Sequence, residues 1–268
     1  MELEKKVGFL GYGNMGSAIL DGLLGKGIVR PGAAGVFDPD AERQAAARAL
    51  GAEVFKTPGE LAAFCDVLLL AVKPQTMDAA LRELGPVPGE TLVISIAAGI
   101  PIAFVESRLG EGARIVRVMP NTPALVQAGA AGIALGANCT EDDAETARAI
   151  FSAIGIAAIV DEALLDAVTA LSGSGPAYFF YLTECLIKAA AAEGLSADVA
   201  TRLAAQTLFG AGKLLAESGE SAATLRERVT SKGGTTEAAL KQFQADGLEA
   251  VVAAAVRAAA QRSKELGG

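Results

Sequence analysis

The chain has 268 residues, a hydrophobic fraction of 51%, a net charge of −8 and no histidine. An acidic chain lacks the positive surface that nucleic-acid binding needs, so we expect no nucleic-acid partner. Without histidine there is no Ser-His or Cys-His nucleophile pair and the commonest metal ligand is missing, so we expect no metal site.

Short apolar runs alternate with helical patterns through the first 160 residues. Several runs are apolar on both faces, as in strands buried in a parallel sheet, and the alternation indicates βαβ units with helices on both sheet faces. We expect strands over 6–10, 34–38, 66–72, 91–96, 114–119, 130–135 and 156–160, with helices near 14–26, 40–50, 59–64, 75–84, 101–109 and 141–153.

After Asp161 the strand patterns stop and only helical patterns follow. Pro176 is placed to open one helix, and Ser196 is the expected N-cap of another. We therefore expect an α/β chain with a dinucleotide-binding domain over 1–160 and an all-helical domain over 161–268. The expected helices of the second domain cover 176–192, 197–217, 221–229, 236–245 and a last segment ending near 266.

The start of the chain has no signal-peptide pattern, and its apolar stretches are too short to span a bilayer. Its three cysteines are far apart and form no CxxC pair. These features predict a protein of the cytoplasm with no membrane partner.

A glycine fingerprint, GYGNMG, follows the first expected strand and opens a helix. Gly11 permits the tight turn, Gly13 lets a pyrophosphate approach the backbone, and Gly16 lets the helix pack close to the strand. A glycine-rich turn without a ligand is the alternative. The sequence predicts a dinucleotide along Leu10, Gly11, Tyr12, Gly13, Asn14, Met15 and Gly16.

Asp38 ends the second expected strand, where a carboxylate can accept hydrogen bonds from an adenosine ribose. Its charge would repel the 2′-phosphate of NADPH, so this position favours NADH. Arg43 lies about one helical turn further on and leaves NADPH open as a cofactor. The alternative is an exposed Asp that only begins an Asp-Pro turn.

Three further segments follow expected strands, where ligands of doubly wound sheets bind. Lys73 can meet the cofactor or remain solvated, and Asn121 can bind a ligand or cap its own turn. Small residues in the second segment leave room for a flat nicotinamide. The expected cofactor contacts here are Ala71, Val72, Lys73, Pro74, Ala97, Ala98, Gly99 and Asn121.

The segment TSKGGTTEAAL, residues 230–240, combines two glycines with four hydroxyl side chains at the start of a helix. Helix N-terminal N–H groups bind anions, and glycines leave them accessible. Ordinary N-capping is the alternative, but capping uses one hydroxyl only. The pattern predicts a carboxylate receptor formed by Ser231, Gly233, Gly234, Thr235 and Thr236.

The motifs LGYGNMGSAI, DVLLLAVKPQ, SIAAGI, VMPNTPA, LSGSGPAYFF and VTSKGGTTEAAL occur in the order seen in pyrroline-5-carboxylate reductases. The chain resembles this family over essentially its whole length. The resemblance implies reduction of L-1-pyrroline-5-carboxylate to L-proline by NADPH or NADH, the last step of proline biosynthesis. It also implies a Rossmann-type doubly wound N-terminal sheet and a C-terminal helical domain that forms a homodimer, often assembled further into a decamer.

The resemblance also assigns roles within the hydroxyl-rich segment. The residues from Ser231 to Thr236 match the part that holds the substrate carboxylate, with Thr236 as proton donor or positioning group. Lys232 stands where the family usually has proline, which loosens the loop and adds a positive charge. Asp38 stands where NADP-preferring members often carry a residue suited to a 2′-phosphate.

Two other function classes stay open. The β-hydroxyacid dehydrogenases have a similar fingerprint and a helical second domain, but use a lysine with an asparagine one helical turn further on. Here Lys188 is followed by AAAAEGL, without that asparagine. A module that binds NAD(P) without turnover is the second alternative, and the intact GGTT segment speaks against it.

Overall fold

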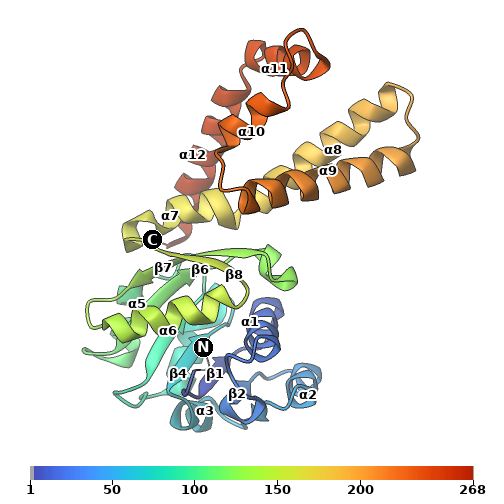
Figure 1. Cartoon of the computed structure of the whole chain (residues 1–268). Coiled ribbons are helices and arrows are strands. Elements are labelled where there is room, and N and C mark those ends of the chain that lie inside the picture. Colours follow the sequence, from blue (N-terminus) through green and yellow to red (C-terminus); the bar gives the residue numbers. More distant parts are fainter. Residues whose placement is uncertain (1–2, 268) are drawn as a thin grey trace. The chain divides into compact units, whose positions relative to one another are not determined.

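The computed structural model describes residues 3–267 (Figure 1). Its strands form one sheet in the order β3-β2-β1-β4-β5-β6-β7-β8. They are β1 (Val7–Leu10), β2 (Ala34–Phe37), β3 (Glu53–Val54), β4 (Val67–Leu70), β5 (Leu92–Ser95), β6 (Arg114–Met119), β7 (Gly129–Leu135) and β8 (Gly155–Ile159).

Helices cover both faces of this sheet. Leu23 and Phe151 belong to the core on one face, and Leu61 and Leu81 belong to the core on the other. The helices are α1 (Asn14–Gly25), α2 (Ala41–Ala49), α3 (Pro58–Phe64), α4 (Met77–Leu84), α5 (Ile102–Leu109) and α6 (Glu141–Ser152). This arrangement confirms the predicted Rossmann-type α/β fold.

Two features of the sheet differ from a simple series of βαβ units. β3 has only two residues at the sheet edge, too few to leave an apolar run in the sequence. β6 and β7 pair antiparallel, whereas the other neighbouring strands are parallel. Residues 120–128, which join β6 to β7, are too few for the crossover that parallel pairing requires.

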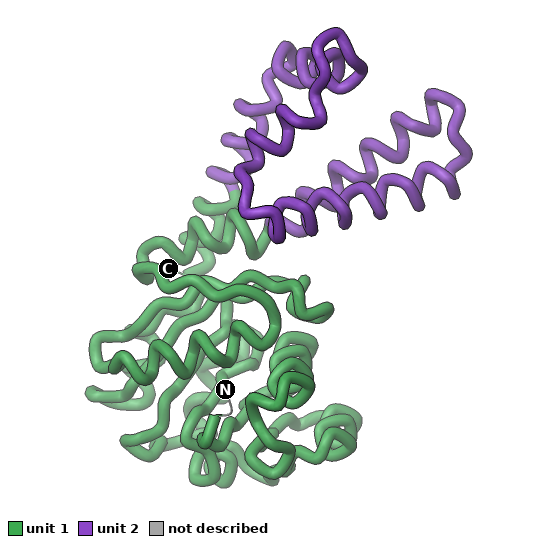
Figure 2. Tube along the Cα trace, viewed as in Figure 1, with its two compact units in different colours: residues 1–174, 259–268 green, residues 175–258 purple. Residues whose placement is uncertain are grey.

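The chain divides into two compact units (Figure 2). The first contains residues 1–174 and 259–268, and the second contains residues 175–258. This division falls later than the predicted boundary at 160, because α7 (Leu165–Val168) packs on the sheet. A Cβ built on Gly132 of β7 would lie 2.8 Å from the Val168 side chain, so the missing side chain permits that close packing.

The second unit is helical, as the sequence predicts. Ser196 caps its second helix and accepts a hydrogen bond from the backbone N–H of Val199 at 3.4 Å. The helices are α8 (Gly175–Ala192), α9 (Ala197–Glu217), α10 (Ala222–Arg228), α11 (Thr235–Ala245) and α12 (Leu248–Gly267), whose end returns to the first unit. Over residues 3–267 no helix has the length and hydropathy to span a membrane.

The start of α6 generates a stability prediction. Asp143 is fully buried and accepts hydrogen bonds from Thr140 N–H at 2.8 Å and from Arg114 at 2.8 Å. Asp143→Ala removes the acceptor from both donors, so we expect the free energy of unfolding to fall by about 2–4 kcal/mol.

Urea unfolding at fixed protein concentration measures that change. Asp142→Ala is the matched control, because Asp142 is exposed and its pair with Lys5 lies at the surface. The control should change stability little. Equal effects of the two substitutions would contradict the role assigned to Asp143.

Candidate cofactor cleft and substrate segment

A large cleft of the first unit lies where the strand order reverses. β2 and β3 follow one another on one side of β1 in the sheet, whereas β4 and β5 follow one another on the other side of β1. Ligands of open α/β sheets bind at such a point, beyond the carboxyl ends of the strands. The cleft there has a volume of about 850 Å³ and is lined from the ends of β1, β2, β4 and β5.

The glycine turn fits this cleft through its backbone. Gly11 has φ +95°, and a Cβ built on it would lie 2.9 Å from the backbone of Ala71. A Cβ on Gly16 would lie 2.9 Å from the Gly11 carbonyl oxygen. Any side chain at these two positions would therefore push the turn or α1 away from the sheet.

Gly13 provides the test of whether a dinucleotide fits. It lines the cleft, and the nearest atom to a Cβ built on it is an Arg43 nitrogen at 3.9 Å. A side chain here would therefore enter the cleft instead of meeting the protein core. Gly13 is the N-cap of α1, and among the described residues no side chain caps the first N–H groups of this helix. Those backbone N–H groups remain for a pyrophosphate.

Asp38 is buried at the end of β2, with 2% of its surface exposed. One carboxylate oxygen accepts from Tyr12 N–H at 2.7 Å, and the other accepts from Asp40 N–H at 2.9 Å. Arg43 lies 3.4 Å from the first oxygen. The carboxylate thus holds the glycine turn in addition to facing the cleft.

The structure brings most of the predicted cofactor contacts together. Tyr12, Gly16, Gly99 and Asn121 do not line the cleft. The lining includes Leu10, Gly11, Gly13, Asn14, Met15, Asp38, Ala71, Val72, Lys73, Pro74, Ala97 and Ala98.

Tyr12 and Asn121 have contacts within the protein instead. Burial, followed by the charge of Asp21, raises the pKa of the Tyr12 phenol to about 12, which keeps it neutral. The Asn121 amide donates to Ser172 O at 3.0 Å and accepts from Ala130 N–H at 2.8 Å. Its side chain therefore joins the loop after β6 to two neighbouring segments.

Sequence reasoning missed one wall of the cleft. The wall is formed by the N-cap of α4 and by residues along its length, which are Thr76, Ala79, Ala80 and Glu83. Their spacing of three, one and three residues is that of one helical face. Helical periodicity after the predicted Lys73 segment was the signal that could have identified this wall.

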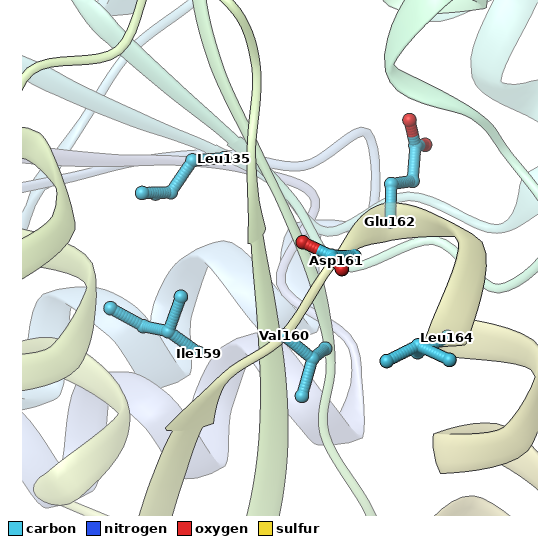
Figure 3. A pocket seen from close by; sticks show the side chains of 6 residues that line it. All are labelled: Leu135, Ile159, Val160, Asp161, Glu162 and Leu164. Carbon is cyan, nitrogen blue, oxygen red and sulfur yellow. The ribbon is translucent and has the colours of Figure 1, made fainter.

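A second cavity of the first unit is smaller, at about 480 Å³ (Figure 3). Apolar side chains, such as Leu135 and Ile159, line it together with the acidic residues Asp161 and Glu162. Glu162 points away from Val160 and Leu164, and accepts from Ile102 N–H at 2.8 Å and Arg117 at 3.0 Å. Glu162 is thus bound within the protein, and the residues that line this cavity are different from those that line the larger cleft.

The predicted substrate segment forms the start of α11 in the second unit. Gly234 is the N-cap of α11, and among the described residues no side chain caps the first N–H groups of this helix. Thr235 and Thr236 are the first helical residues, so neither acts as the N-cap. A Cβ on Gly234 would meet the Ser231 hydroxyl and would lie 3.1 Å from the Ser231 carbonyl oxygen, so a side chain there would crowd the segment.

Glu237 occupies part of this segment. Its carboxylate accepts a hydrogen bond from Gly233 N–H and pairs with Lys241 at 3.0 Å. The hydrogen bond from Lys241, and then that from Gly233, lowers the pKa of Glu237. A carboxylate of the protein itself is therefore already bound by one of the predicted donor groups.

Gly16 generates a test of the cleft. Gly16→Ala places a methyl group against the Gly11 carbonyl, so we expect NADH binding to weaken at least about tenfold as α1 moves. Gly25→Ala is the matched control in the same helix, because a Cβ there meets nothing within 4 Å. Titration of NADH fluorescence measures both; equal affinities would contradict the packing argument.

Comparison with known proteins agrees with this geometry. Residues 6–99 match the family model described as NADP oxidoreductase, coenzyme F420-dependent. Residues 162–266 match the model described as pyrroline-5-carboxylate reductase dimerisation.

Similar proteins extend over the whole chain. A pyrroline-5-carboxylate reductase of Pseudomonas aeruginosa is 46% identical, covering 97% of this chain and 96% of its own length. The solved structure of the Coxiella burnetii enzyme is 35% identical with a TM-score of 0.94, covering 99% and 100% of the two chains. The NADP-bound structure from Plasmodium falciparum is 31% identical with a TM-score of 0.86, covering 100% of both. The chain belongs to the pyrroline-5-carboxylate reductase family.

Proposed function

We propose that this protein reduces L-1-pyrroline-5-carboxylate to L-proline with NADH or NADPH, as the last step of proline biosynthesis. The observation that carries the proposal is the cleft at the strand switch point, in a chain that aligns over 97% of its length with a reductase of this name. A reducing compartment such as the cytoplasm suits its three free thiols.

The first unit would bind and orient the dinucleotide. The N–H groups at the start of α1 would hold the pyrophosphate, and Asp38 would face the adenosine ribose. Ala97 and Ala98 leave space for the nicotinamide because they are small. The reduced nicotinamide supplies the hydride when it is bound.

The second unit would hold the substrate through the start of α11. The free N–H groups of the first turn and the hydroxyls of Ser231, Thr235 and Thr236 would bind the substrate carboxylate. Thr236 would position the ring or donate a proton to its nitrogen. A protonated cyclic imine accepts hydride readily, so orientation of the reactants is the main demand on the protein.

The second unit would also form the dimer. Its helices expose large apolar side chains that a monomer in water does not favour. Those on α8 include Phe179, Phe180 and Tyr181, those on α9 include Leu203 and Phe209, and α12 adds Val251 and Val252. We propose a homodimer through these helices, with a decamer as the further assembly.

The proposed reaction is measured by loss of absorbance of the reduced nicotinamide when substrate is added. We expect turnover with both cofactors, and kcat/KM with NADH equal to or above that with NADPH, because Asp38 repels a 2′-phosphate. Folded protein that turns over with neither cofactor would refute the reaction. A large preference for NADPH would refute only the argument from Asp38.

Thr236 carries the substrate prediction. Thr236→Ala removes a hydroxyl donor to a charged substrate, so kcat/KM for the imine should fall about 10- to 100-fold with NADH affinity unchanged. Thr236→Ser should recover most of the activity. Thr201→Ala, an exposed threonine of α9, is the control. Unchanged steady-state kinetics of Thr236→Ala would remove Thr236 from the mechanism.

A further inference from the structure

The loop after β5 forms one wall of the cofactor cleft, and beyond Ile96 this wall is made of very small residues. Ala97 and Ala98 line the cleft, and Gly99 follows with φ +76°. Ala98 is exposed, whereas Gly99 is buried. Ile96 and Ile100 anchor the two ends of the loop on the cores of the sheet. The residues between them carry at most a methyl group, so the position of this middle stretch also depends on what packs behind it.

The last turn of α12 packs behind this loop. A Cβ built on Gly99 would lie 3.1 Å from the carbonyl oxygen of Leu266. A Cβ built on Gly267 would lie 2.9 Å from the carbonyl oxygen of Gly99 and 3.6 Å from its Cα. The two backbones are therefore in direct contact, within the unit to which both segments belong (Figure 2).

The segment around α7 holds the two chain segments next to this contact, which are the end of α12 and the start of α5. Asp166 accepts a hydrogen bond from the hydroxyl of Ser263 at 2.6 Å, and Ser263 is only 6% exposed. Glu162 accepts from the N–H of Ile102, which begins the helix after the loop. One short segment thus attaches the end of α12 and the start of α5, with Gly99 between them.

We infer that the last turn of α12, through the backbone of Leu266 and Gly267, is a positioning element for the nicotinamide half of the cofactor cleft. The inference rests on the proposed dinucleotide function. The turn after β1 and Asp38 after β2 take the pyrophosphate and the adenosine half, so the wall after β5, beyond β4, faces the nicotinamide half. The turn acts through the backbone of Gly99 and does not touch the cofactor.

Gly267→Ala tests the inference with a single methyl group. Alanine is a better helix former than glycine, so the substitution does not weaken α12 itself. The methyl group meets the Gly99 backbone and displaces the loop. We expect the dissociation constant of NADH to rise about three- to tenfold, because the nicotinamide half would lose part of its contact with the displaced loop. NADH fluorescence measures it without any substrate.

The probe 5′-ADP separates positioning from general destabilisation. It lacks the nicotinamide and its ribose and carries only the adenosine and the pyrophosphate, so Gly267→Ala should leave its affinity, measured by calorimetry, unchanged. Equal weakening of 5′-ADP and NADH would overturn the inference, because the whole cleft would then be disturbed. Glu265→Ala is the matched control in the same turn, since Glu265 bonds only to Arg262 and Gln261 of its own helix in the described structure.

Deletion of residues 264–268 gives a second, independent variant. It removes the contact instead of crowding it, and should weaken NADH binding with 5′-ADP binding retained. Wild-type NADH affinity in both variants would overturn the inference. Failure of the proposed reaction is seen separately, as wild-type protein that binds NADH but does not reduce the imine.

Discussion

The hydrogen bond from Tyr12 N–H to the buried carboxylate of Asp38 holds the cofactor cleft in shape. It attaches the glycine turn after β1 to the end of β2 over 2.7 Å, beside a second bond from Gly11 N–H to Phe37 O at 2.8 Å. A buried carboxylate is costly unless hydrogen bonds satisfy it, and Asp40 N–H supplies another. The turn is therefore preorganised, so little of the binding free energy is spent on ordering it.

The helix N-termini of the chain differ in how their first N–H groups are bound. Asp40, Thr57, Thr140, Ser196 and Ser221 cap their helices with side-chain oxygens. Helices α1 and α11 instead begin at glycines, without a side-chain cap among the described residues. A side-chain cap would compete with a ligand for the same N–H groups. Helices α4, α5 and α7 also lack a side-chain cap in the described structure, so an uncapped start alone does not mark a ligand site. The proposed function assigns anionic groups to the starts of α1 and α11.

The sequence predicted the parts of the fold that depend on local pattern. Apolar runs, helical periodicity and Ser196 as a cap identified the longer strands and the helices, because each signal lies within a few residues of the element. The direction of β7 and the packing of α7 depend on contacts distant in sequence, such as Gly132 with Val168. No local pattern records such a contact, so the boundary at 160 came earlier than the division between the compact units.

The candidate site divides in the same way. The glycine turn and the strand-end segments could be predicted because a backbone that must approach a ligand or a neighbouring strand closely requires small residues, and glycine and alanine are visible in the sequence. The second role of Asp38 could not, because its partner is a backbone N–H that every residue except proline carries. In this chain the groups proposed to bind both reactants are mainly backbone N–H groups. The proposed function therefore depends on where the backbone lies, and the close contacts at Gly16 and Gly99 help to set that position.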